Sequence, residues 1–286
     1  MNITTPADFY HAGLLSPRDA SRDPREPSFR EDLVDIDMRA CEFVRPAAVL
    51  WCAIYPMLAA RRARQCRLLV PENVGVCVYL KSLGLFGMLQ EVGVEVDDRG
   101  IRDQVNPQSI LPLTRFFSAD DVENLAETAL DTLSQAGLGS ANIHPIVSEA
   151  FAELALNAVQ HAESPIGGLG LIQFYQFERG KRFICAVADG GIGIRRALER
   201  NPALRDSVPY DWDAIKLALR ERVTGTGERT RGIGLYGIAQ DMRQTGRQLI
   251  IHSGQGTVSV SSGDAEDQSQ RTTLFPGTLA YVSIAT

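Results

Sequence analysis

The chain has 286 residues, of which 44% are hydrophobic and 22% are charged, the balance of an ordinary soluble globular protein. That length favours two domains over one and allows a core large enough to need no disulfide or metal. Lys and Arg number 29 against 35 Asp and Glu, and the net charge of −6 argues against general binding to nucleic acids or membranes.

Cysteine and histidine usage argues against a disulfide framework and a zinc site. The five cysteines are an odd number without a CxxC pair, which predicts buried reduced thiols. No two of the four histidines have metal-ligand spacing within a Cys or carboxylate cluster. The longest apolar run, 47–60, is too short to span a membrane, and the N-terminus has no signal pattern. We therefore expect a cytoplasmic protein.

The first part of the chain predicts a polar arm followed by a small α/β domain. Residues 1–30 are rich in Pro, Asp, Arg and Ser, which is typical of a flexible arm or a docking segment. Over 31–115 strand-like and helix-like patterns alternate, as in a small α/β domain. The expected elements are strands at 33–44, 66–71 and 94–97, helices at 47–64 and 74–93, and an extended piece at 110–116 that completes this domain or begins a connector.

An amphipathic helix at 120–138 is expected inside a connector spanning 116–139. Leu125, Ala129 and Leu133 contribute to its apolar stripe, and glycines at 137 and 139 stop it. The motifs with chemical content follow in 140–286.

The first of these motifs is a polar row on a predicted helix, 145–162. Glu153, Asn157 and His161 are four residues apart and share one helix face. An amide oxygen can bind Mg²⁺, and a carboxylate one turn earlier can accept a proton. Taken alone, the row also fits a solvated polar stripe.

The second motif is a strand that ends in an acid and glycines. The apolar run before Asp189 predicts the strand, and Gly190, Gly191 and Gly193 follow. Glycines allow close backbone approach to a ligand, while the carboxylate can accept from an exocyclic amine. An ordinary Asp-Gly turn is the alternative.

Two glycine motifs complete the set. Gly232, Gly234 and Gly237 form GxGxxG and open a helical stretch at 235–242, an arrangement that suits phosphates. A dinucleotide-binding fingerprint is disfavoured, because the preceding residues are polar rather than a strand. Gly277 and Thr278 open a terminal strand, where Thr278 could be an ordinary hairpin residue.

In this order the four motifs resemble the boxes of the GHKL, or Bergerat-fold, ATPases, over about residues 140–286. The resemblance implies an α/β fold of two domains. The C-terminal one, 140–286, would be a Bergerat sandwich, a mixed sheet covered by helices on one face. It implies ATP and Mg²⁺ as cofactors, Glu153 as the general base and Asn157 as the metal ligand. The residues expected to bind nucleotide are Asn157, His161, Asp189, Gly191, Gly193, Ile194, Arg231, Gly232, Gly234, Leu235, Gly237 and Thr278.

Within this resemblance each residue has an expected part. Asp189 would hold the adenine amine, Gly191 and Gly193 would shape the adenine pocket, and Thr278 would lie nearby. Residues 194–231 would form an ATP lid.

Glu153 separates branches of the family. Histidine kinases commonly carry Asn at this position, and no upstream helix carries an acceptor His. His161 and the absence of a long second domain after the last motif make the anti-sigma-factor serine kinases the best match. The N-terminal domain resembles STAS antagonist domains in element order. Its turn at 70–75, "VPENVG", has no Ser or Thr to accept phosphate.

Two functions stay open. The first is a Mg-dependent Ser/Thr protein kinase that acts on a regulatory partner, either an antagonist domain or a transcription regulator. The second is an ATP-gated switch that transfers no phosphate to protein, while a module that only binds nucleotide is disfavoured by the intact Glu153 and Asn157. The resemblance is also compatible with a homodimer.

Overall fold

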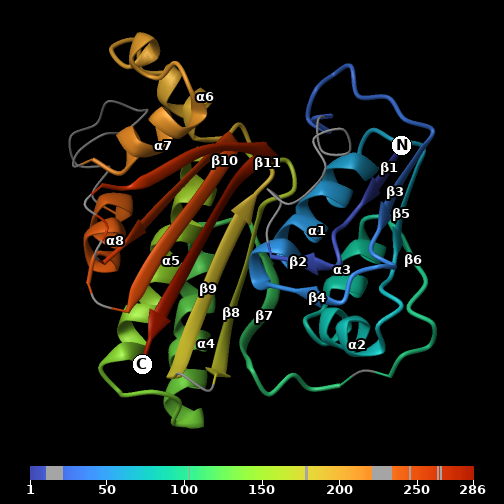
Figure 1. The fold of residues 1–286 in the computed structure, drawn as a ribbon, viewed down its shortest axis with the longest axis horizontal. Coiled ribbons are helices and arrows are strands. Elements are labelled where there is room, and N and C mark those ends of the chain that lie inside the picture. The colour runs from blue at the N-terminus through green and yellow to red at the C-terminus, as the bar shows by residue number, and fades with distance from the viewer. Residues whose placement is uncertain are drawn as a thin grey trace. The chain divides into compact units, whose positions relative to one another are not determined.

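The computed structural model describes residues 1–10, 22–102, 104–177, 180–220, 234–244, 246–262, 264 and 266–286. It confirms an α/β chain, which divides into two compact units, Met1–Pro107 and Gln108–Thr286. Both units carry sheets and helices (Figure 1).

The first unit is built on a parallel sheet of order β1-β3-β5-β6, with a separate parallel pair, β2-β4. A helical connection lies between β3 and β5 and another between β5 and β6, and such a connection returns the chain to run parallel. The elements are β1 (Asn2–Thr4), β2 (Asp8–Phe9), β3 (Leu33–Asp37), β4 (Phe43–Val44), α1 (Pro46–Ala60), β5 (Gln65–Leu69), α2 (Val74–Ser82), α3 (Leu85–Glu91) and β6 (Glu95–Val96).

The prediction of a flexible arm over 1–30 is wrong for its first ten residues. β1 pairs with β3, and the Thr5 N–H donates to the Asp37 carbonyl at 2.9 Å. Ile3 and Phe9 are fully buried. Short strands of this kind depend on partners some thirty residues away, which local composition does not reveal. Residues 11–21 lie outside the described residues.

The single helix predicted over 74–93 is two helices, α2 and α3. The chain turns at Gly84, whose φ of 87° is a left-handed conformation that glycine adopts without strain. Asn73 caps α2, since its side chain accepts from the Val76 N–H at 3.2 Å. The α2 start therefore confirms the strand-to-helix turn expected at 70–75.

The second unit contains a five-stranded sheet of order β10-β11-β9-β8-β7, and each described pairing is antiparallel. The expected mixed sheet is therefore wrong for these pairings. Hairpins join β8 to β9 and β10 to β11, while the helices α4 and α5 lie between β7 and β8 in the chain. The elements are β7 (Ser109–Phe116), α4 (Ala119–Ala136), α5 (Ile143–His161), β8 (Gly168–Phe177), β9 (Gly180–Asp189), α6 (Ile194–Glu199), the 3-10 helix η2 (Arg205–Ser207), α7 (Asp211–Ala218), α8 (Gly234–Met242), β10 (Arg247–Ser261) and β11 (Gln268–Ala285).

The unit boundary differs from the expected one. β7, placed by sequence in the 31–115 domain, pairs with β8 in the second sheet. The expected connector 116–139 contains α4, which packs on α5, with the Ser148 hydroxyl donating to the Ala126 carbonyl at 2.8 Å. Val122 and Leu133 of α4 are buried in the same core. The apolar stripe of α4 is thus an internal packing face.

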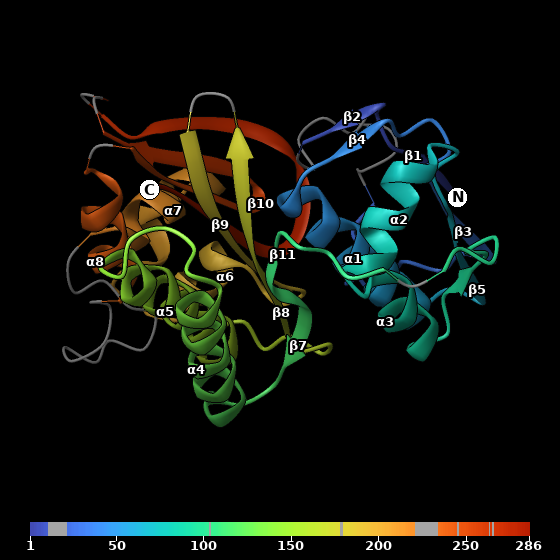
Figure 2. The same cartoon turned by 90° about the horizontal axis from the view of Figure 1, so that it is seen from below.

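One core lies between the sheet of the second unit and the helices α4, α5 and α8 (Figure 2). Phe151 on α5 meets Phe116 on β7 edge to face, with ring centroids 6.3 Å apart. Burying an aromatic side chain of this size contributes about 1.5–3 kcal/mol. This core fixes α5 against β8 and β9, and thereby fixes the polar face of α5.

The hairpin of β10 and β11 is long. β11 begins at Gln268, which pairs with Ser259 of β10. The five cysteines are buried and free, as predicted. None of the helices in the described part of the chain has the length and hydropathy of a membrane span.

Candidate functional site

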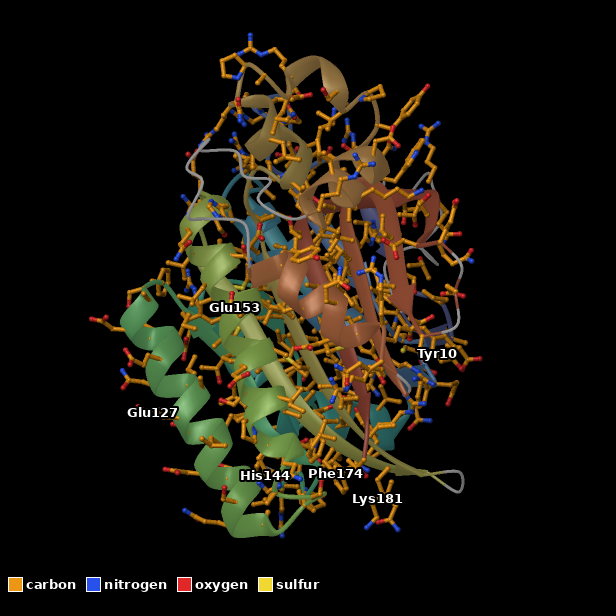
Figure 3. All side chains as sticks on the ribbon, turned by 90° about the vertical axis from the view of Figure 1, so that its left-hand side faces the viewer. Tyr10, Glu127, His144, Glu153, Phe174 and Lys181 are labelled. Atoms are coloured by element: carbon orange, nitrogen blue, oxygen red, sulfur yellow. The ribbon has the colours of Figure 1, made fainter. Side chains whose placement is uncertain are left out.

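The polar face of α5 lines a cavity of about 710 Å³. Phe151 and Ala155 bury the opposite face of the helix in the core, and Glu153, Asn157 and His161 line the cavity. Figure 3 shows Glu153 on α5, beside α8. A concave site of this size suits a nucleotide-sized ligand.

The cavity gathers residues from all four motifs. Predicted residues that line it are Glu153, Asn157, His161, Asp189, Gly193, Ile194, Gly234, Leu235, Gly237 and Thr278. Gly191 is near the cavity without lining it, while Arg231 and Gly232 lie outside the described residues. Apolar walls come from Leu154, Val187, Leu198, Ile238 and Ile251.

Asp189 lies at the end of β9 and is 4% exposed. Its Oδ1 accepts from the Gly191 N–H at 2.8 Å and from the Thr278 N–H at 3.3 Å. Two backbone donors from different segments hold the carboxylate in one orientation at the wall of the cavity. A buried, oriented acceptor of this kind can recognise an amine donor on a ligand.

Gly191 allows the loop after β9 to approach the end of α5. A Cβ on Gly191 would lie 1.9 Å from the Ala162 carbonyl oxygen, closer than any side chain can come. The neighbouring Ile192 N–H donates to that same oxygen at 2.8 Å. The contribution of Gly191 is therefore close packing behind the cavity wall.

Asn157 lines the cavity, and its side-chain amide nitrogen makes a hydrogen bond. Its Nδ2 donates to the Glu153 carbonyl at 2.6 Å, which fixes the amide and leaves Oδ1 for a ligand. Across the described residues, no group of three or more His, Cys, Asp and Glu side chains could hold a metal. One amide oxygen suits Mg²⁺, which commonly takes one or two protein ligands and completes its shell with water and phosphate oxygens.

The first residue of α8 lies against the Glu153 carboxylate. A Cβ on Gly234 would come within 2.0 Å of Glu153 Oε2. The helix N-terminus carries unpaired N–H groups and a partial positive charge, which favours anions. Gly234 thus lets the start of α8 and the carboxylate of α5 share one end of the cavity.

Sequence reasoning missed Ser253, which ties three segments together behind the cavity. Its hydroxyl accepts from the Ile194 N–H at 2.9 Å and donates to the Gly277 carbonyl at 3.0 Å. Ser253 is 2% exposed and lies 3.1 Å from the Thr278 hydroxyl. Nothing in the sequence around Ser253 signals this, because its neighbours come from the register of β10 and β11.

Charged residues outside the motifs also line the cavity. Glu149 and Asp241 add carboxylates, and Arg200 at the end of α6 adds a guanidinium. Arg200 pairs with Glu163 and lowers the pKa of that carboxyl below its ordinary value through its hydrogen bond. No protein-family model matches the chain, and no curated protein matches it.

Proposed function

We propose that the second unit is a GHKL, or Bergerat-type, domain that binds ATP with Mg²⁺. The observation that carries the proposal is that residues from four separate motifs meet at one cavity. The motifs are far apart in the chain, and an ordinary polar stripe or Asp-Gly turn has no reason to bring them together. A sheet covered by helices on one face supports the same proposal.

Asp189 marks the adenine end of the proposed site. Its carboxylate is buried and held by two backbone donors, so it can accept from the exocyclic amine of adenine. Gly193 and Ile194 line the wall beside it. Apolar residues such as Val187 and Ile251 offer surfaces for a flat ring.

The phosphate end lies between α5 and the start of α8. The N-terminus of α8 favours phosphate, and Asn157 Oδ1 offers a ligand for Mg²⁺. Mg²⁺ bound there would neutralise charge on the phosphates. Glu153 lies one turn before Asn157 and can take the proton of an attacking hydroxyl group.

The reaction we propose is transfer of the γ-phosphoryl group to a Ser or Thr hydroxyl of a regulatory protein. The hydroxyl loses its proton to Glu153, its oxygen forms the new bond to phosphorus, and ADP leaves. The partner class, an antagonist domain or a transcription regulator, follows from the resemblance to anti-sigma-factor kinases. The alternative is an ATP-gated switch in which water is the acceptor, or turnover is absent.

Calorimetric titration of the full chain with ATP, with and without Mg²⁺, tests nucleotide binding. We expect Asn157→Ala to lose the Mg²⁺-dependent part of the affinity, and Glu153→Ala to bind but lose turnover. Absence of wild-type binding at millimolar ATP would refute the proposal. Glu123→Ala, on the exposed face of α4, is the control.

Incubation with ATP labelled at the γ-phosphate separates the kinase from the switch. Label on a candidate partner protein that depends on Glu153 supports the kinase. Free phosphate without labelled protein supports the switch.

A further inference from the structure

The segment after α5 is hydrogen-bonded to the loop 190–193, which follows Asp189 at the end of β9. The Ala162 carbonyl accepts from the Ile192 N–H at 2.8 Å, and the Ser164 hydroxyl accepts from the Gly190 N–H at 3.1 Å. The loop after β9 is thus hydrogen-bonded to residues on both sides of position 163.

Glu163 has an unusual backbone and a specific partner. Its φ of 51° lies in the left-handed region, which costs free energy for a residue with a Cβ. The Glu163 carboxylate accepts hydrogen bonds from both terminal nitrogens of Arg200, with Nη2 2.7 Å from Oε2. A bidentate pair restrains direction as well as distance.

Arg200 brings this pair to the cavity. It directly follows α6 and lines the same cavity as Asp189. The ion pair therefore joins the segment after α5 to the residue that follows α6. The loop 190–193 directly precedes α6 in the chain.

We propose that the Arg200–Glu163 pair is a clamp that positions the loop 190–193 beside Asp189 and sets affinity for the base end of the ligand. This inference rests on the proposed nucleotide site. Arg200 and Glu163 are positioning residues in it, acting through the loop and α6. Their side chains are 53% and 56% exposed, so the clamp is a modest, salt-sensitive device.

Arg200→Gln and Glu163→Gln test the clamp, and α6 supplies a matched control. Arg195 pairs with Glu199 at 2.9 Å and does not line the cavity. The binding probes are ATP, adenosine and tripolyphosphate, measured by calorimetry at low salt. We expect either clamp variant to weaken ATP and adenosine about two- to five-fold and to leave tripolyphosphate unchanged. Arg195→Gln should bind all three as wild type does.

Combined variants test whether the two residues act as one. The double variant should bind no worse than either single variant, because both remove the same interaction. Exchanging the pair, Glu163→Arg with Arg200→Glu, should recover affinity. Unchanged adenosine affinity in Arg200→Gln, or an equal loss for tripolyphosphate, would overturn the clamp while leaving ATP binding in place.

Hydrogen exchange provides a readout that needs no nucleotide. Arg200→Gln should speed exchange of amides in peptides covering 186–198, and Arg195→Gln should leave the exchange rate of the amides at 190–193 unchanged. If wild type bound no ATP, the proposed function would fall and exchange alone would decide whether the pair restrains the loop. Equal protection in wild type and Arg200→Gln would refute the clamp.

Discussion

Thr278 lies directly opposite Asp189 in the pairing of β11 with β9, and its N–H donates to Oδ1 of that carboxylate at 3.3 Å. These residues are 89 positions apart in the chain. The register places Ser253 opposite Thr278 on the next strand, so one row of residues crosses three strands, and Asp189 and Thr278 of that row line the cavity.

Asp189→Asn should weaken ATP binding, because the amide keeps an acceptor oxygen but loses the charge that strengthens a bond to an amine. A hydrogen bond to a charged group contributes about 1.5–3 kcal/mol, so we expect roughly a 10- to 100-fold rise in Kd by calorimetry. Asp131→Asn on the exposed face of α4 is the control. Wild-type affinity in Asp189→Asn would contradict the adenine assignment.

Gly234→Ala should impair turnover while leaving the fold stable. The new Cβ would push the Glu153 carboxylate, the movable end of a flexible side chain, away from its place. Displacing a reacting group by about 1 Å can cost on the order of 100-fold in rate. Gly87→Ala in α3, with open space around it, should leave turnover unchanged. Undiminished turnover in Gly234→Ala would remove Glu153 from the proposed reaction.

Gly191→Ala should destabilise the second unit itself. Its Cβ would meet backbone atoms of Ala162 that cannot move without shifting the end of α5. Overpacking of this kind costs roughly 1–3 kcal/mol, which chemical denaturation measures directly. The same substitution at Gly87 should be neutral or stabilising. A wild-type unfolding midpoint for Gly191→Ala would show that the loop packs differently.

Acid should destabilise the first unit through Asp37. Hydrogen bonds from Arg39 hold the pKa of this carboxyl below its ordinary value. The stabilisation is therefore present above the unfolded-state pKa and is lost as pH falls through the lower folded-state pKa. Asp37→Asn should be less stable than wild type at pH 7, and the gap should close toward pH 2.

Urea unfolding at both pH values measures this difference. Asp32→Asn is the control, because Asp32 is 90% exposed and its ion pair with Arg64 is long, at 3.6 Å. A gap that stayed constant from pH 7 to pH 2 would mean that the Asp37 carboxylate contributes nothing through its charge.

Much of the site was predictable, since its residues belong to short patterns. The four-residue spacing on α5 placed Glu153 and Asn157 on one face, and apolar neighbours turned that face away from the core. Glycines marked the end of β9 and the start of α8. The same patterns could not reveal Ser253 or the Glu163–Arg200 pair, because each meets partners from distant segments.

The sequence by itself indicated α4, α5 and the strand that ends at Asp189, and it indicated which side of α5 is polar, because periodicity and glycine act within a few residues. Only the tertiary structure decided that β1 joins the first sheet, that β7 and α4 belong to the second unit and that the sheet pairings there are antiparallel. Strand pairing and register are set by burial and hydrogen bonding between distant segments. Those interactions also determine which side chains meet at the cavity.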